Sequence, residues 1–160
     1  MKSGYLAPER PPAEQFAGLS IAILATRWNV EIVDALVAGA RRTLADWGVR
    51  AEQVREFRSP GAYELPLLAH QLFERGHCDG IVAVGAVIRG DTPHFDFVAG
   101  ECARGLMDVQ LRHGRPVGFG VLTVNDYAQA EQRAGAGSDN KGCEAAAAML
   151  EMLTLSRSIA

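Results

Sequence analysis

The segment Gly90-Asp91-Thr92-Pro93-His94 groups residue types suited to binding an anion and moving a proton. It stands between an apolar run and an amphipathic stretch, which predicts a turn from a strand into a helix. The free N–H groups of a helix N-terminus, together with the Thr92 hydroxyl, can hold a phosphate. A histidine such as His94 can transfer protons near neutral pH. The alternative is structural: Asp91 or Thr92 caps the helix, and His94 is an exposed or capping residue.

A phosphate in this loop would need a cation from elsewhere, because Asp91 adds a negative charge of its own. Arg133 and Lys141 are the candidates. Lysine occurs only at positions 2 and 141, and Lys141 stands between a glycine-rich loop and a predicted helix. A cation beside a phosphate forms strong charge-assisted hydrogen bonds. The alternative is that both side chains are simply solvated.

Two other residues lie where predicted strands give way to helices. Trp28 directly follows the first apolar run, and its ring could stack on a planar heterocycle or pack in the core. Glu64 falls in the first turn of a predicted helix, where a carboxylate also complements the helix dipole. A ligand-binding role for Glu64 requires its side chain to point toward the strand ends.

Alternating strand and helix patterns must position these residues. Short apolar runs predict strands at 19–26, 80–88 and 116–124. Residues 54–58 also read as a strand, which the turn Ser59-Pro60-Gly61 ends. Amphipathic or alanine-rich stretches predict helices at 28–48, 62–76, 95–114, 127–135 and 141–158. This alternation predicts an α/β fold with a four-stranded parallel sheet, helices on both faces and right-handed crossovers. Ligands bind beyond the carboxyl ends of such strands, so the strand ends at residues 27–29, 59–64, 89–94 and 123–125 should meet at one edge.

Length and composition fit a single domain and exclude several classes of protein. The chain has 160 residues, a formal net charge of −3 and 22% charged residues. No basic excess favours a nucleic-acid partner, and no apolar stretch is long enough to span a membrane. Residues 1–17 are rich in proline and predict an extended polar arm, and residues 18–160 predict one domain. The arm lacks the apolar run of a signal peptide.

Cysteine usage and motif searches narrow the chemistry further. The odd set Cys78, Cys102 and Cys143 has no metal-ligand spacing, and the adjacent His77 has no partner ligands, so no metal site is predicted. Three unpaired cysteines favour a reducing cytoplasm. Neither GxGxxG nor GxxxxGK[ST] is present, which removes the main support for dinucleotide binding and P-loop phosphoryl transfer. A GxSxG nucleophile elbow is also absent.

Taken together, the candidate residues resemble the lumazine synthase family of riboflavin biosynthesis. Six matching segments follow the family's order across roughly residues 19–155. They are Ala25-Thr26-Arg27-Trp28-Asn29, Pro60-Gly61-Ala62-Tyr63-Glu64-Leu65-Pro66, Gly85 through Asp96, Phe119-Gly120-Val121-Leu122-Thr123, Glu131-Gln132-Arg133-Ala134-Gly135 and Asn140-Lys141-Gly142.

The resemblance implies a flavodoxin-like three-layer sandwich around a four-stranded parallel sheet. It implies the condensation of 5-amino-6-(D-ribitylamino)uracil with 3,4-dihydroxy-2-butanone 4-phosphate. The products are 6,7-dimethyl-8-ribityllumazine, phosphate and water, and no metal or organic cofactor takes part. It also implies homopentamers whose sites lie between adjacent subunits.

Residue roles follow from the same resemblance. Trp28 would stack on the pyrimidine, and His94 would move protons. The pyrimidine and ribityl chain would be held by Asn29, Ala62, Tyr63, Glu64, Val87 and Ile88. The phosphate loop would be Gly90, Asp91 and Thr92. The neighbouring subunit would supply Phe119, Lys141 and Arg133, with Arg133 pairing with the phosphate.

Two features leave alternatives open. Asp91 stands where the family varies, which predicts weaker phosphate affinity. The segment between Arg133 and Lys141 lacks the extra residues of members that stop at pentamers, so a sixty-subunit icosahedral shell is permitted.

Two other functions compete with the enzyme. One is a flavin- or lumazine-binding module without turnover, and the other is a structural shell protein with weak activity.

Overall fold

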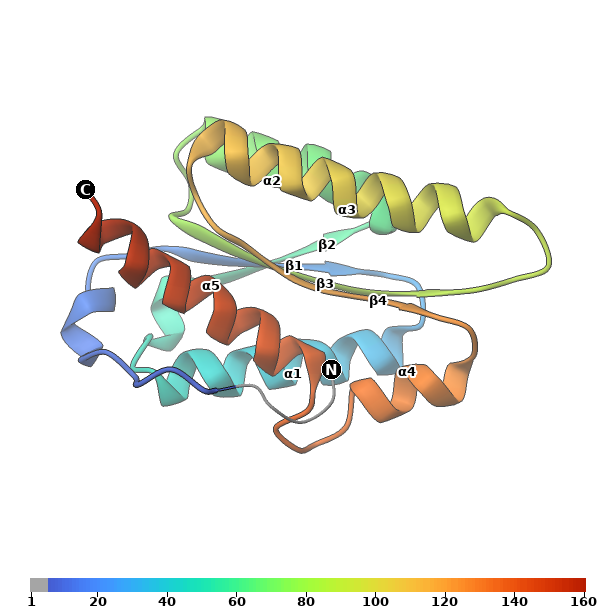
Figure 1. The fold of residues 1–160 in the computed structure, drawn as a ribbon, viewed down its shortest axis with the longest axis horizontal. Coiled ribbons are helices and arrows are strands. Elements are labelled where there is room, and N and C mark those ends of the chain that lie inside the picture. The colour runs from blue at the N-terminus through green and yellow to red at the C-terminus, as the bar shows by residue number, and fades with distance from the viewer. Residues whose placement is uncertain (1–5) are drawn as a thin grey trace.

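One parallel sheet organises the part of the chain that the computed structural model describes, residues 6–160. Its strands are β1 (Ile21–Thr26), β2 (Val54–Ser59), β3 (Gly80–Ile88) and β4 (Val117–Val124), in the spatial order β2-β1-β3-β4 (Figure 1). All three pairings are parallel. This confirms the predicted sheet, and its order matches the first four strands of the flavodoxin-like arrangement.

Five α-helices cover the two faces of the sheet. They are α1 (Val30–Asp46), α2 (Leu65–Glu74), α3 (His94–His113), α4 (Tyr127–Arg133) and α5 (Lys141–Ser158). Figure 1 shows α2 and α3 on one face and α1, α4 and α5 on the other. The predicted three-layer sandwich is therefore confirmed. The helix predicted from residue 62 starts with a 3-10 turn, Ala62–Glu64, and becomes α-helical with Pro66 in its first turn. None of these helices is long and apolar enough to cross a membrane.

Alternate residues of the strands divide the core into two clusters. Ile23 of β1 packs with α1 and α5, whereas its neighbour Leu24 packs with α2 and α3. Both side chains are fully buried. Burial on both faces explains why the central strands β1 and β3 read as continuous apolar runs rather than alternating ones.

The order of the strands creates the crevice in which the site lies. The chain passes from β1 to β2 on one side and then returns to β3 on the other side of β1. Adjacent connections therefore diverge beyond the carboxyl ends of β1 and β3, which is where doubly wound sheets bind ligands.

The N-terminal arm departs from expectation. Ala13–Phe16 forms a 3-10 helix rather than extended chain, and Phe16 is buried with its ring centroid 6.3 Å from that of Trp47. The Gln53 side-chain amide donates to the carbonyls of Phe16 and Leu19. The extended arm predicted for residues 1–17 is thus wrong over 13–16, because Phe16 can bury its ring. Residues 1–5 lie outside the described part, and the division into arm and domain stays a prediction.

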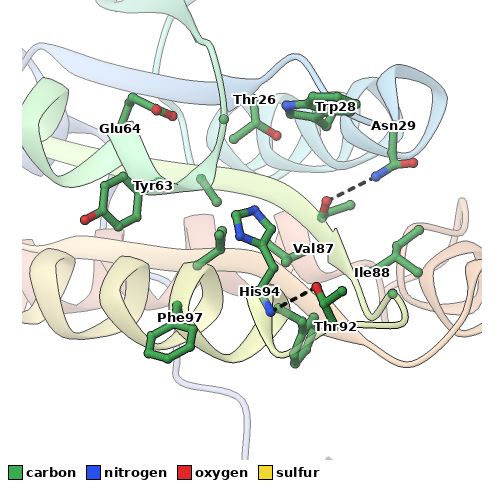
Figure 2. Close-up of a pocket in the computed structure, with 16 residues that line it drawn as sticks. Thr26, Trp28, Asn29, Tyr63, Glu64, Val87, Ile88, Thr92, His94 and Phe97 are labelled. Carbon is green, nitrogen blue, oxygen red and sulfur yellow. Dashed lines mark hydrogen bonds between the residues drawn. The ribbon is translucent and has the colours of Figure 1, made fainter.

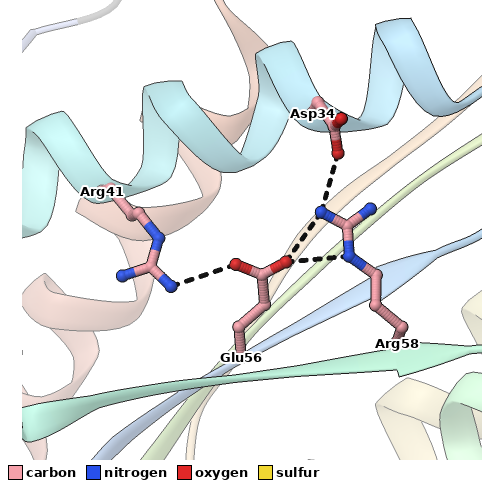
Figure 3. Close-up of polar contacts among 4 residues, drawn as sticks. All are labelled: Asp34, Arg41, Glu56 and Arg58. Atoms are coloured by element: carbon pink, nitrogen blue, oxygen red, sulfur yellow. Dashed lines mark hydrogen bonds and ion pairs between the residues drawn. The ribbon is translucent and has the colours of Figure 1, made fainter.

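A charged network joins the edge strand β2 to α1 (Figure 3). Glu56 accepts hydrogen bonds from Arg41 at 3.0 Å and from Arg58 at 2.8 Å, and Arg58 also bonds Asp34 at 2.7 Å. Partial burial of the carboxylate opposes its ionisation, but the two arginines outweigh this and hold the pKa of Glu56 below its ordinary value. Charges on an edge strand also discourage pairing with other strands.

We expect Glu56→Gln to destabilise the protein at neutral pH and much less in acid. A carboxyl group whose pKa is lower in the folded state contributes stability above its unfolded-state pKa and loses it as the pH falls through the folded value. For a partly exposed network the loss should be about 1 kcal/mol. Thermal melts of both proteins between neutral and acid pH measure it. Glu52→Gln, which removes only an exposed pair with Arg50, is the control. An equal loss at every pH would contradict the assignment.

Candidate functional site

A cavity of about 690 Å³ opens at the carboxyl ends of β1 and β3, beside the turn that follows β2 (Figure 2). It contains most of the residues that the sequence singled out. These are Trp28, Asn29, Ala62, Tyr63, Glu64, Val87, Ile88, Gly90, Thr92 and His94. The predicted meeting is confirmed for the ends of β1, β2 and β3, whereas residues 123–125 at the end of β4 do not line the cavity. The role of each side chain remains a prediction.

Trp28 and Glu64 converge on one wall of the cavity. A Cβ atom built on Gly61 would lie 3.2 Å from Glu64 Oε2 and 3.5 Å from Trp28 Cδ1, so both side chains approach the backbone of Gly61. Trp28 is 72% exposed, and its placement in the core is thereby ruled out. Glu64 also meets the condition set for ligand binding, because its carboxylate reaches back toward the strand ends.

Asn29 braces the floor between β1 and β3. It adopts a left-handed backbone conformation with φ of 55°, which asparagine tolerates better than most residues. Its side-chain amide donates a 3.2 Å hydrogen bond to the carbonyl of Ala86. The loop that carries Trp28 is consequently tied to the neighbouring strand.

The loop from β3 into α3 combines a hydroxyl, free N–H groups and an imidazole. Thr92 Oγ1 accepts from the His94 backbone N–H at 3.4 Å, but the N-cap position of α3 is Pro93 and not Thr92. Asp91 is exposed and makes no hydrogen bond to α3 among the described residues, so capping by Asp91 is wrong. His94 begins α3, and its ring points into the cavity (Figure 2).

Arg89, which was not among the predicted site residues, anchors the loop from β3 into α3. Its guanidinium donates to Asp96 at 3.3 Å and to Asn125 at 3.2 Å, and lies 4.2 Å from the centre of the Phe95 ring. These contacts join the start of α3 to the end of β4. Arg89 therefore positions the loop rather than lining the cavity, and only the folded chain brings Asn125 to it.

Four predicted residues lie outside the cavity: Asp91, Phe119, Arg133 and Lys141. Arg133 donates to the carbonyl of Gln129 in its own helix, and Lys141 pairs with Glu144 at 2.6 Å. Phe119 is 47% exposed on the edge strand β4. Phe119, Arg133 and Lys141 therefore do not line the cavity of their own chain.

Other lining residues were missed by sequence reasoning. Phe97 and Val98 follow His94 by three and four residues, so helical spacing alone could have placed them on its face. Thr26 ends β1 and is buried, and its hydroxyl has no hydrogen-bond partner among the described residues. In the sequence, the only sign that Thr26 lines the cavity was a polar residue at the end of an apolar run.

Cysteine chemistry has no part in this cavity. None of the three free cysteines lines it. Burial raises the pKa of Cys78 to about 11 and that of Cys102 to about 12. Both remain protonated thiols near neutral pH and serve as apolar core residues.

The fold and cavity define a doubly wound α/β protein that binds a small molecule at its switch point. Its wall offers an aromatic face and a carboxylate, and its rim a helix N-terminus with a histidine. Comparison with known proteins identifies the family to which this chain belongs. A sequence profile described as 6,7-dimethyl-8-ribityllumazine synthase matches residues 18–157. The chain therefore belongs to the 6,7-dimethyl-8-ribityllumazine synthase family.

Relatives bearing that name cover most of the chain. The protein from Deinococcus deserti is 51% identical over 141 residues, 88% of this chain and 90% of its own length. That of Nitratidesulfovibrio vulgaris strain Miyazaki F is 54% identical, with 84% and 86% covered. That of Desulfovibrio desulfuricans is 52% identical, with 85% and 87% covered.

Proposed function

We propose that this chain catalyses the final condensation of lumazine formation, joining 5-amino-6-(D-ribitylamino)uracil to 3,4-dihydroxy-2-butanone 4-phosphate. The products are 6,7-dimethyl-8-ribityllumazine, phosphate and water. The observation that carries the proposal is the single cavity that Trp28, Glu64, Thr92 and His94 line together, in a chain whose family match spans residues 18–157.

Each substrate suits a different part of the cavity. The pyrimidine stacks on Trp28, and Asn29, Ala62 and Tyr63 flank it, with Val87 and Ile88 on the β3 side. Glu64 accepts hydrogen bonds from ribityl hydroxyls. The phosphate binds the N–H groups of Gly90, Asp91 and Thr92 in the loop that leads into the N-terminus of α3.

Neighbouring subunits complete the site in this proposal. Phe119, Arg133 and Lys141 do not line the cavity of their own chain, so a partner chain would bring them to it. Exposed apolar side chains on α2 and α3 favour such an assembly, because a monomer would leave them in water. Leu67, Met107 and Leu111 are 60%, 51% and 73% exposed. A homopentamer is the assembly we propose, and size exclusion with light scattering tests it.

The reaction needs positioned groups but no cofactor. An amine of the pyrimidine attacks the butanone carbonyl and forms an imine with loss of water. Elimination then expels phosphate, and the second nitrogen closes the ring with loss of another water. Holding both reactants together lowers the barrier by several kcal/mol. His94 moves protons between nitrogen, oxygen and carbon, and Arg133 of a neighbour stabilises the departing phosphate.

Mixing both substrates with the protein and following the absorbance of the lumazine tests the function. Product at an ordinary enzymatic rate supports the proposal and excludes both competing functions. Tight binding of a lumazine or flavin without product would instead favour a binding module. A large particle with a very low rate would favour a structural shell protein.

We expect His94→Ala to slow the reaction by less than a thousandfold. Proton transfer by a positioned side chain contributes about 10²–10⁴, and the electrophilic ketone and the aromatic amine are reactive enough for proximity to supply most of the acceleration. Steady-state rates with both substrates saturating provide the measurement. A residual rate below about one-thousandth of wild type would show that His94 dominates the chemistry.

A further inference from the structure

We propose that His70, Glu74 and His113 form a binding site for a divalent transition-metal ion of the zinc class, remote from the cavity. His70 Nδ1 lies 2.9 Å from His113 Nε2, whereas Glu74 Oε2 lies 3.9 Å from the other ring nitrogen of His113, Nδ1. One ligand atom from each of the three side chains falls within 4.8 Å of the others. Nothing in the proposed reaction uses these residues.

The fold brings these three side chains together before any ion binds. His70 and Glu74 are four residues apart on α2 and so share one face of the helix. His113 is the last residue of α3. Because α2 and α3 pack against the same core cluster, the spacing between their facing side chains is set by the fold.

Packing against Phe73 fixes His113, whereas the Glu74 side of the cluster is open to solvent. The His113 side chain is only 12% exposed, and the Phe73 ring centroid lies 5.6 Å from its own. The Glu74 side chain is 66% exposed, so its carboxylate can swing toward an ion. Water has access from the same side and can occupy a fourth position.

The ligand chemistry matches zinc, cobalt or nickel rather than calcium or magnesium. Two imidazole nitrogens with one carboxylate form a common zinc ligand set, whereas calcium and magnesium select oxygen. With Zn–N bonds of about 2.0–2.1 Å, tetrahedral geometry separates two ligand nitrogens by about 3.3 Å. The observed 2.9 Å corresponds to a shared hydrogen bond. If the two imidazole rings move slightly apart, the ion can take the place of the proton that they share.

An ion here would join two helices rather than take part in catalysis. His94 and His113 stand at opposite ends of the 20-residue helix α3, which at 1.5 Å per residue is about 30 Å long. An ion that binds only the folded chain raises its melting temperature by mass action.

Titration of the tag-free, chelator-treated chain with Zn²⁺, followed by calorimetry, tests the site. We expect one ion per chain, a higher melting temperature with Zn²⁺, and a tetrahedral visible spectrum with Co²⁺. His70→Gln and His113→Gln should each weaken binding at least tenfold. Glu74→Gln should also weaken it, and its exposed position spares the fold. His77→Gln removes an exposed histidine outside the cluster and should change nothing.

Two outcomes would overturn the proposal. Absence of saturable binding by the folded wild-type chain would leave the histidine pair as a hydrogen bond between helices. Equal affinity in Glu74→Gln, His113→Gln and wild type would place the ion elsewhere on the surface. Circular dichroism of each variant shows that its fold is intact, and calorimetry needs no enzymatic turnover, so both outcomes are independent of the proposed reaction.

Discussion

Two inactive variants should recover activity when their subunits assemble together. One chain carries Trp28→Ala with His94→Ala and lacks the proposed stacking ring and proton carrier of its own cavity. The other carries Arg133→Ala and lacks the cation proposed to complete its neighbour's site. Each alone should fall to about one-hundredth of wild-type activity or less, from the typical cost of a lost stacking face and a lost charge-stabilising group.

The recovery follows from where these residues lie. Trp28 and His94 line the cavity, whereas Arg133 does not. If each site combines one chain's cavity with its neighbour's Arg133, random co-assembly makes about a quarter of the sites fully wild type. Activity of the mixture should therefore rise to about a quarter of the wild-type value, as measured by lumazine formation after joint unfolding and refolding.

The control separates assembly from simple mixing. The two variants mixed as preformed oligomers, without dissociation, should stay inactive. If co-assembled oligomers form but no activity returns, Arg133 does not act across the subunit boundary.

Gly142→Ala should strongly destabilise the protein although Gly142 lies outside the cavity. Gly142 lies in the first turn of α5, which crosses α1 closely. A Cβ atom there would overlap the backbone carbonyl oxygen of Leu36 and lie 2.9 Å from Asn140 Oδ1. Because the obstacle is backbone, the helices must separate, and we expect a loss of about 3 kcal/mol or more.

Displacing the first turn of α5 would also break hydrogen bonds that Asn140 makes. Asn140 is buried, and its Oδ1 accepts from the N–H groups of Gly142 and Cys143, while its Nδ2 donates to the carbonyls of Ala35 and Gly135. Displacing the turn therefore breaks a cap and a tie to α1 together. Lys141 would move as well, so activity should fall with stability.

Thermal melts at one protein concentration measure the effect, because the stability of an oligomer depends on concentration. Gly100→Ala is the matched control: Gly100 is also helical, and a Cβ there meets nothing within 4 Å. That variant should be neutral or gain up to about 1 kcal/mol from helix propensity. If Gly142→Ala melts like Gly100→Ala, the close approach of α1 and α5 is not what limits stability.

Local pattern and chemistry were readable from the chain alone. Hydrophobic periodicity predicted all four strands and five helices, with ends within a few residues, because burial on a sheet or under a helix face repeats at short range. The run from Gly90 to His94 and the positions of Trp28 and Glu64 after strands also identified the edge where they meet. That inference needed only the rule that parallel strands point the same way.

Other features depended on contacts between distant segments. Whether Trp28 lay in the core or over a cavity could not be decided from spacing, because both positions favour a large aromatic ring. The clamp from Arg89 to Asn125 spans 36 residues, and the pair His70–His113 spans 43. The chain itself therefore determined the elements and the chemical groups at their ends, since these follow from local sequence. Only the tertiary structure decided which groups share a cavity, because that depends on how the helices pack across the sheet.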